Sequence, residues 1–256
     1  MEQETRTARD AGAPVKIGAE AVRAAAEVLR RYRAGKQNLD RRIIDNEQFW
    51  KLRHWEQMEK AGEGGNPEDV RPASGWLVNC ILSKHADAMD CYPEPTVLPR
   101  EPGDRQEAET LSRILPVLLK NDRFRRTYSK AWWDKLKSGC AVYGVFWDNE
   151  KLHGLGDVSI RSMDVLNLFW EPGVTDIQES EHFFCTELVP NNHLVRRWPE
   201  LEGKLGRGGA QVSRYLFDDK VDTSEQSLVV DWYYHTEREG RQVLQYWNCL
   251  LYTSPS

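Results

Sequence analysis

The stretch Asn121–Gly173, NDRFRRTYSKAWWDKLKSGCAVYGVFWDNEKLHGLGDVSIRSMDVLNLFWEPG, decides the fold that we expect for this chain. It begins with an amphipathic helix, because apolar side chains recur there at the 3.6-residue spacing of one helix face. These side chains are Phe124, Tyr128, Ala131, Trp132 and Leu136. Gly139 follows them, and glycine readily adopts the left-handed conformation that ends a helix. The pattern therefore predicts a helix that stops at Gly139.

The opposite face of this helix is predicted to be basic. Arg123, Arg126, Lys130 and Lys137 fall on that face, and Arg125 lies close to them in the sequence. A solvated helix face is the ordinary interpretation of such a pattern. A contact with nucleic-acid phosphates is the alternative, because lysine and arginine supply most of the affinity for the phosphate backbone.

Two strands are expected after Gly139. Residues 140–147 form a continuous apolar run, CAVYGVFW, which is typical of a strand covered on both faces. Val158, Ile160 and Met163 then alternate with polar residues, which indicates a strand with one face in the core. The polar connection between the two runs contains His153. We therefore expect a β-hairpin with a long, solvated tip.

Helices are expected before this stretch and strands after it. Residues 1–18 are small and polar, which predicts a disordered arm. A helical region is predicted over 19–139, followed by a β-rich region with a short helix over 140–249, so the fold class is α+β. The last residues, 250–256, resemble a translated sequencing-adapter tail and are treated as a non-native tail.

The helices expected in the N-terminal region have recognisable starts and stops. They begin at Ala19, at Asn38, at Pro72–Ala73 and at Asp104, with the first ending near Gly35, the second at Lys60 and the third before Tyr92. Pro116 is expected to kink or interrupt the fourth helix. Between the third and fourth helices, PEPTVLPREPG is extended and offers 96–98 as an edge strand. Downstream, strands are expected over 181–189, 227–235 and 242–251, with a short helix over 191–198.

Composition excludes several classes of protein. The 256 residues carry a net charge of -5 and 29% charged residues, which describes a mildly acidic protein and not a strongly basic nucleic-acid binder. We find no apolar run of the roughly 18 residues that a membrane span needs and no secretory signal. The five cysteines are scattered without a CxxC pair, which favours free thiols with packing roles.

The motif search predicts no catalytic residues, no metal site and no cofactor. The run GKLGRGG, residues 203–209, lacks both nucleotide-binding glycine patterns. The six histidines show no HExxH motif, and no GxSxG elbow is present. Glu202 with Lys204 resembles half of a nuclease signature but is expected in a turn, and the acidic residues at 218, 219, 222 and 225 do not have the spacing of an EF-hand.

Two alternative functions remain open at this point. One is a metal-dependent nucleic-acid-processing enzyme that uses Glu202 and the acidic residues near Asp218. The other is a DNA-binding module, because several of the ten tryptophans lie beside basic residues, as in residues 50–55, WKLRHW. Aromatic residues more commonly fill cores and subunit interfaces, which is the interpretation that we favour for them.

The order of these segments resembles the N-terminal half of tailed-bacteriophage portal proteins, the head-to-tail connectors. The resemblance covers roughly residues 38–200 and rests on pattern and order. It includes FWK at 49–51, a helix with Asn79 after a proline loop, PEPTVLP, and the helix that ends in WWDKLKSGCAVYGVFWD. The hairpin then leads to VLNLFWEPG. The family's hallmark positions would be Gly139, Asn167, Trp170 and Pro172.

The resemblance implies a structural, non-enzymatic subunit of a twelve-subunit ring at one capsid vertex. It implies contacts with the terminase large subunit, with capsid, scaffolding and head-tail adaptor proteins, and with double-stranded DNA without sequence specificity. It places the protein in the virion and, during assembly, in the bacterial host cytoplasm, with no membrane contact. This chain would be an N-terminal, wing-like fragment without the family's stem and clip regions. Interface or DNA-facing residues would be Arg123, Arg125, Arg126, Lys130 and His153.

Overall fold

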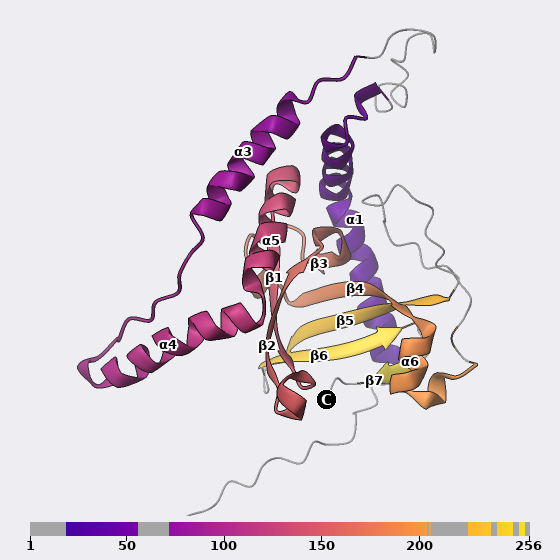
Figure 1. The fold of residues 1–256 in the computed structure, drawn as a ribbon. Helices are drawn as coiled ribbons and strands as arrows, with labels where there is room; N and C mark the ends of the chain where they lie inside the picture. Colours follow the sequence, from indigo (N-terminus) through magenta and orange to yellow (C-terminus); the bar gives the residue numbers. More distant parts are fainter. Residues whose placement is uncertain are drawn as a thin grey trace, which may run out of the picture. The chain divides into compact units, whose positions relative to one another are not determined.

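A computed structural model describes residues 19–55, 72–203, 205, 225–236, 240–247 and 251–253 of the chain. The chain forms two compact units, which are described separately (Figure 1). The first unit combines Met1–Asn38 with Leu166–Ser256, and the second is Leu39–Val165. The expected disordered arm, residues 1–18, lies outside the described residues. The α+β class is confirmed.

The helices and strands follow one another in a simple order. Helix α1 (Ala19–Trp50) contributes its first part to the first unit and its last part to the second. The second unit continues with α3 (Trp76–Asp90), η1 (Pro102–Asp104), α4 (Arg105–Asn121), α5 (Phe124–Ser138), β1 (Val142–Asp148), η2 (Lys151–Gly154) and β2 (Asp157–Met163). After η3 (Val165–Asn167) come β3 (Leu168–Trp170), η4 (Ile177–Glu179), β4 (His182–Pro190), α6 (Asn191–Arg197), η5 (Pro199–Leu201), β5 (Gln226–Thr236), β6 (Gly240–Trp247) and β7 (Leu251–Thr253).

The first unit is built on a five-stranded antiparallel sheet in the order β3-β4-β5-β6-β7. Each strand pairs with its neighbour in the sequence, as in a meander. The predicted strands over 181–189 and 227–235 are confirmed as β4 and β5, and the strand expected over 242–251 corresponds to β6 and the start of β7. Strand β7 lies within residues 250–256, the expected non-native tail, and pairs with β6. This pairing does not test where the tail comes from.

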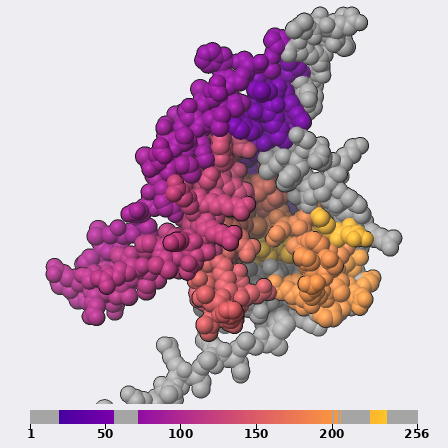
Figure 2. All heavy atoms as spheres, in the orientation of Figure 1, coloured from indigo at the N-terminus to yellow at the C-terminus, as the bar shows by residue number. Residues whose placement is uncertain are grey.

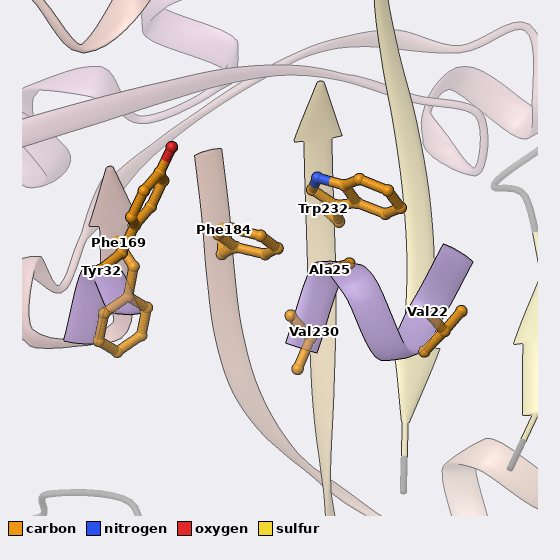
Figure 3. Close-up of a cluster of buried hydrophobic side chains, with 7 residues drawn as sticks. All are labelled: Val22, Ala25, Tyr32, Phe169, Phe184, Val230 and Trp232. Carbon is orange, nitrogen blue, oxygen red and sulfur yellow. The ribbon is translucent and has the colours of Figure 1, made fainter. Parts of the chain in front are cut away.

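Helix α1 covers one face of this sheet. Figure 3 shows the buried cluster, whose members are Val22, Ala25, Tyr32, Phe169, Phe184, Val230 and Trp232. The Phe184 ring lies between two partners: it meets Tyr32 edge-on at 6.0 Å and stacks with Trp232 at 6.2 Å, centroid to centroid. Burying a side chain of this size contributes about 2–3 kcal/mol. The opposite face of the sheet carries Val229, which packs with Leu194 of α6 and Leu201 of η5.

Helix α1 does not end at Gly35, as the sequence predicted, but continues through it to Trp50. The reason is a close packing contact: a Cβ at Gly35 would lie 2.6 Å from Cγ of Pro172. Gly35 is therefore glycine because the aromatic-proline segment passes directly over the helix, and not because the helix stops. The next residue, Lys36, is buried, and its Nζ lies 4.7 Å from the centroid of the Phe169 ring.

Helix α5 organises the second unit, as its apolar spacing predicted. Ala131 is buried, and the rings of Phe124, Tyr128 and Trp132 follow one another along the helix with centroids 6.1–6.2 Å apart. Trp133 stacks on His85 of α3 at 4.0 Å. The helix ends at Gly139, which has φ +86° and donates its N–H to the carbonyl of Lys135. The predicted glycine exit is confirmed.

The buried carboxylate of Asp122 ties the β1–β2 hairpin to the turn between α4 and α5. Its Oδ1 pairs with Lys151 Nζ at 2.5 Å, and its Oδ2 accepts the Ile160 N–H at 2.7 Å. Lys151 Nζ also donates to the Val158 carbonyl at 2.8 Å. A two-stranded hairpin is only marginally stable by itself. These three polar contacts, together with packing on α5, therefore hold it in place.

Three finer expectations for the second unit are wrong. Strand β1 is not covered on both faces, because Tyr143, Val145 and Trp147 are exposed on one of them. Pro116 does not interrupt α4, which runs unbroken from Arg105 to Asn121. The segment 96–98 is extended but unpaired within the described residues, and the Val97 N–H donates to the Ser112 hydroxyl of α4 at 2.9 Å.

Substituting Gly35 with alanine is expected to destabilise the first unit by about 1–3 kcal/mol, because the new Cβ overlaps Pro172. Alanine is the better helix former by about 1 kcal/mol, so without this contact the same change would be stabilising. Thermal unfolding followed by circular dichroism measures the change. Gly35→Ala combined with Pro172→Ala should recover stability. The control is Gly103→Ala, where a Cβ meets nothing within 4 Å; equal effects at Gly35 and Gly103 would contradict the packing contact.

Replacing Asp122 with alanine is expected to cost about 2–3 kcal/mol, because it leaves the Ile160 N–H and the Lys151 ammonium without their acceptor. The ammonium is partly exposed, which keeps the cost below that of a fully buried charge. Urea unfolding measures it. Asp122→Ala combined with Lys151→Met should be less destabilised than Asp122→Ala alone. If the double variant is less stable than Asp122→Ala alone, the unpaired Lys151 ammonium is not the source of the destabilisation.

Candidate functional site

A stripe of unpaired cations runs along the first turns of α5. Arg126 and Lys130 stand four residues apart on one face of the helix, Arg123 directly precedes the first helical residue, and all three are exposed. Their side chains form no hydrogen bond or ion pair with any residue that the structure describes. The predicted basic face is therefore present at these three positions, which we call the basic stripe.

Arg125 and Lys137 do not belong to this stripe. Arg125 lies on another side of the helix, with its guanidinium carbon 5.8 Å from the centroid of the Tyr92 ring. Lys137 was predicted on the solvated face, and this prediction is wrong: its Nζ forms a 2.8 Å ion pair with Glu47, whose side chain is 8% exposed. Asn46 completes the contact by donating to the Lys137 carbonyl at 3.0 Å. The last turn of α5 is thereby fixed to the end of α1.

Arg123 occupies a strained backbone position. It precedes α5 with φ +54° and ψ +37°, a left-handed conformation that costs a residue with a side chain about 1–2 kcal/mol. Glycine or asparagine would adopt it more easily. The tight turn between Asp122 and Phe124 requires this conformation, because α4 and α5 are joined there without a longer loop.

The hairpin tip around His153 is strained in the same way. Leu152 and His153 both have positive φ, +52° and +58°, and both are exposed. Gly156 nearby also has positive φ, and a Cβ there would lie 2.4 Å from Nε1 of Trp147. The tip therefore has a defined shape that presents His153 to solvent. Nothing in the described part of the chain faces His153 as a polar partner.

The hallmark positions prove to be parts of the scaffold. Gly139 caps α5, and the Asn167 carbonyl accepts the Thr186 hydroxyl of the neighbouring strand at 3.3 Å. Trp170 lies in β3 with its ring 5.7 Å from Lys36 Nζ, and Pro172 packs on Gly35. Gly139 thus ends the helix before the hairpin, and Asn167, Trp170 and Pro172 shape the segment after it.

Large apolar side chains are exposed on the second unit. On α4 they are Leu111, Ile114 and Val117, which are 47–57% exposed. On β1 they are Tyr143, Val145 and Trp147, of which Val145 is 67% exposed. Figure 2 shows the atoms of α4, in magenta, at the surface of the face in view. Surfaces of this kind in soluble proteins commonly mark sites where another molecule binds.

The described residues show no arrangement suited to catalysis. No three His, Cys, Asp or Glu side chains among them are grouped as metal ligands would be. Glu202 is exposed in a turn after η5, and Asp218, Asp219 and Asp222 lie outside the described residues. Burial, assisted by Asp231 and Cys185, raises the pKa of Tyr233 above its usual range, which fits a structural phenol paired with Phe183 across the strands. In the part of the chain that was searched, no helix is long and apolar enough to cross a membrane.

Sequence reasoning missed the residues that fix these surfaces. The patterns that predict the α5 helix and the polar hairpin connection do not indicate that Asp122 and Lys151 form an ion pair. Glu47 lies in a segment of mixed charge, where nothing marks it as buried. Pairs that are distant in sequence, such as Glu47 with Lys137, leave no local signal. A carboxylate directly at a helix-to-helix turn, such as Asp122, is the one feature that could have been noticed.

Comparison with known proteins agrees with this picture of a scaffold that presents surfaces. A search of curated proteins found no match. The family model described as phage P22-like portal protein matches residues 85–249, well over half of the chain. This range includes α4, α5, the β1–β2 hairpin and the sheet through β6. The chain belongs to the phage P22-like portal protein family, whose members are structural proteins of bacteriophages.

Proposed function

We propose that this chain is a subunit of a portal ring, the channel at one capsid vertex through which a phage genome enters and leaves. Its family membership over residues 85–249 is the observation that carries the proposal. The exposed apolar side chains of α4 and β1 support it, because a ring subunit covers such surfaces with neighbouring copies. A ring of twelve copies is the assembly that we expect.

The proposed partners follow from that role. They are other copies of the chain, the terminase large subunit during packaging, the capsid and scaffolding proteins around the vertex, and the head-tail adaptor that joins the tail. The protein would act in the virion and, before that, in the host cytoplasm during assembly. No cofactor or catalytic residue is required, because the work of packaging is done by the motor that docks on the ring.

The basic stripe of Arg123, Arg126 and Lys130 is the surface that we assign to DNA. Its three cations are unpaired among the described residues and free to meet phosphates. The chain as a whole has a net charge of -5, so binding must be local and weak. Weak contact without base recognition suits a channel through which DNA has to slide. His153 at the hairpin tip is proposed as a contact with a neighbouring subunit.

Self-association tests the ring proposal. Sedimentation velocity over a range of protein concentrations should show reversible assembly, since heterologous contacts between identical subunits build rings. Placing a charge in the exposed apolar surface, as Val145→Asp or Ile114→Asp, should shift the chain toward monomer. Negative-stain microscopy of the largest species should show closed rings.

The matched control is Ser83→Asp, which adds the same charge at an exposed position of α3. It should leave association unchanged. A chain that stays monomeric at every concentration, or that associates equally well with Asp at 145 and 114, would contradict the assignment of these surfaces to neighbouring subunits.

DNA binding by the stripe is expected to be weak and strongly dependent on salt. Each phosphate contact that is lost lowers the slope of log affinity against log salt by about 0.9. Arg126→Gln with Lys130→Gln should therefore reduce this slope by roughly two, equally for duplexes of any sequence. Fluorescence anisotropy with a labelled duplex measures it. Arg41→Gln with Arg42→Gln, exposed cations on α1, is the control, and an equal loss there would show that net charge and not the stripe attracts DNA.

A further inference from the structure

A groove in the second unit shares only Arg123 with the surfaces that we assign to ring assembly and DNA contact. It lies between the extended segment 92–96 and the turn from α4 to α5, and its volume is about 560 Å³. This is within the size range of sites that bind a small ligand or a few side chains. All of its lining residues belong to the second unit, so the groove is complete within that unit.

The floor of the groove is apolar. The rings of Tyr92 and Phe124 stand 6.3 Å apart, and Pro116 and Leu119 of α4 complete the surface. Burial raises the pKa of the Tyr92 phenol, while the nearby Arg125 acts in the opposite direction. The wall formed by the extended segment is held in position, because Val97 exchanges two hydrogen bonds with the Ser112 hydroxyl.

The rim of the groove is cationic. Lys120, Arg123 and Arg125 line it, and none of their side chains forms an ion pair with a described residue. Glu94 is the one carboxylate among the lining residues, so three positive charges and one negative give a local charge of +2. This local excess contrasts with the chain's net charge of -5. An anionic ligand would therefore be attracted here specifically.

The strained backbone of Arg123 also supports a binding role for the groove. Its left-handed backbone conformation is one that glycine would adopt without the cost of about 1–2 kcal/mol. Strained residues cluster at sites where the side chain or its position serves binding. Here the residue that carries the strain also supplies one of the three rim cations.

We propose that this groove binds an acidic peptide segment of a partner protein, with an apolar side chain on the Tyr92–Phe124 floor and carboxylates on the Lys120, Arg123 and Arg125 rim. Arginine is well suited to carboxylates because its planar fork donates two parallel hydrogen bonds. Duplex DNA fits less well, since the floor of rings and prolines would meet no apolar side chain on its phosphate backbone. The proposal does not depend on ring assembly.

The test uses fluorescein-labelled short peptides in which Asp or Glu alternates with Leu or Phe, titrated with the full chain and followed by anisotropy. Matched peptides carry Asn or Gln in place of the acids. The acidic peptides should bind, and the amide peptides should bind at least about tenfold more weakly, as expected when charge-assisted hydrogen bonds become neutral ones. Lys120→Gln and Arg123→Gly should each weaken the acidic peptides several-fold.

Two controls separate binding from folding and from net charge. Arg123→Gly should raise the melting temperature while it weakens binding, because it relieves the left-handed strain. Arg126→Gln removes the same charge from α5 outside the groove lining and should leave peptide affinity unchanged. Absence of binding, equal binding of acidic and amide peptides, or equal losses at Arg123 and Arg126 would overturn the proposal. A labelled duplex that displaces the peptide and depends on Lys120 and Arg123 would assign the groove to DNA instead.

Discussion

The buried carboxylate of Asp122 is the interaction on which the surfaces of the second unit depend. It closes α4, accepts the Ile160 N–H and pairs with Lys151, so one residue fixes both the turn into α5 and the hairpin that follows. That turn forces Arg123 into a left-handed conformation, and Arg123 belongs both to the basic stripe and to the lining of the groove. The hairpin in turn exposes the apolar side chains of β1. The contacts of Asp122 with Lys151 and Ile160 thus position all three surfaces for which we propose DNA contact, peptide binding or subunit contact.

The first unit depends on a different constraint, the close passage of the aromatic-proline segment over α1. Pro172 lies against Gly35, and Lys36 lies over the Phe169 ring, so the strand that follows the hairpin is locked to the helix that begins the described chain. Phe184 and Trp232 pack on the face of the sheet that α1 covers, and Val229 packs on the other face. Three of the four predicted hallmark positions, Asn167, Trp170 and Pro172, lie in this unit, where they take part in packing and in a hydrogen bond between neighbouring segments.

The sequence alone predicted what depends on local periodicity. The apolar spacing of α5, the glycine exit at Gly139 and the β1–β2 hairpin follow from patterns of a few residues, and the order of elements led to the portal family. Prediction from the sequence fails where a residue that is distant in the chain determines the local structure. The sequence predicts a helix end at Gly35 because Pro172, which lies against this glycine, is far away in the chain. It predicts a solvated Lys137 because the partner Glu47 lies on another helix. The sequence predicts most of the basic stripe. It does not predict the groove, because the groove forms only when residues 92–125 are folded against one another.

The central claim is that Asp122 holds the α4–α5 turn and the hairpin together as one element, separately from the five-stranded sheet. Hydrogen–deuterium exchange of the wild-type chain and of Asp122→Asn tests this most directly. We expect the amides of β1, β2 and the start of α5, above all that of Ile160, to lose protection from exchange in the variant. The amides of β4 and β5 should keep their protection. Unchanged protection at Ile160, or an equal loss in the sheet, would contradict it.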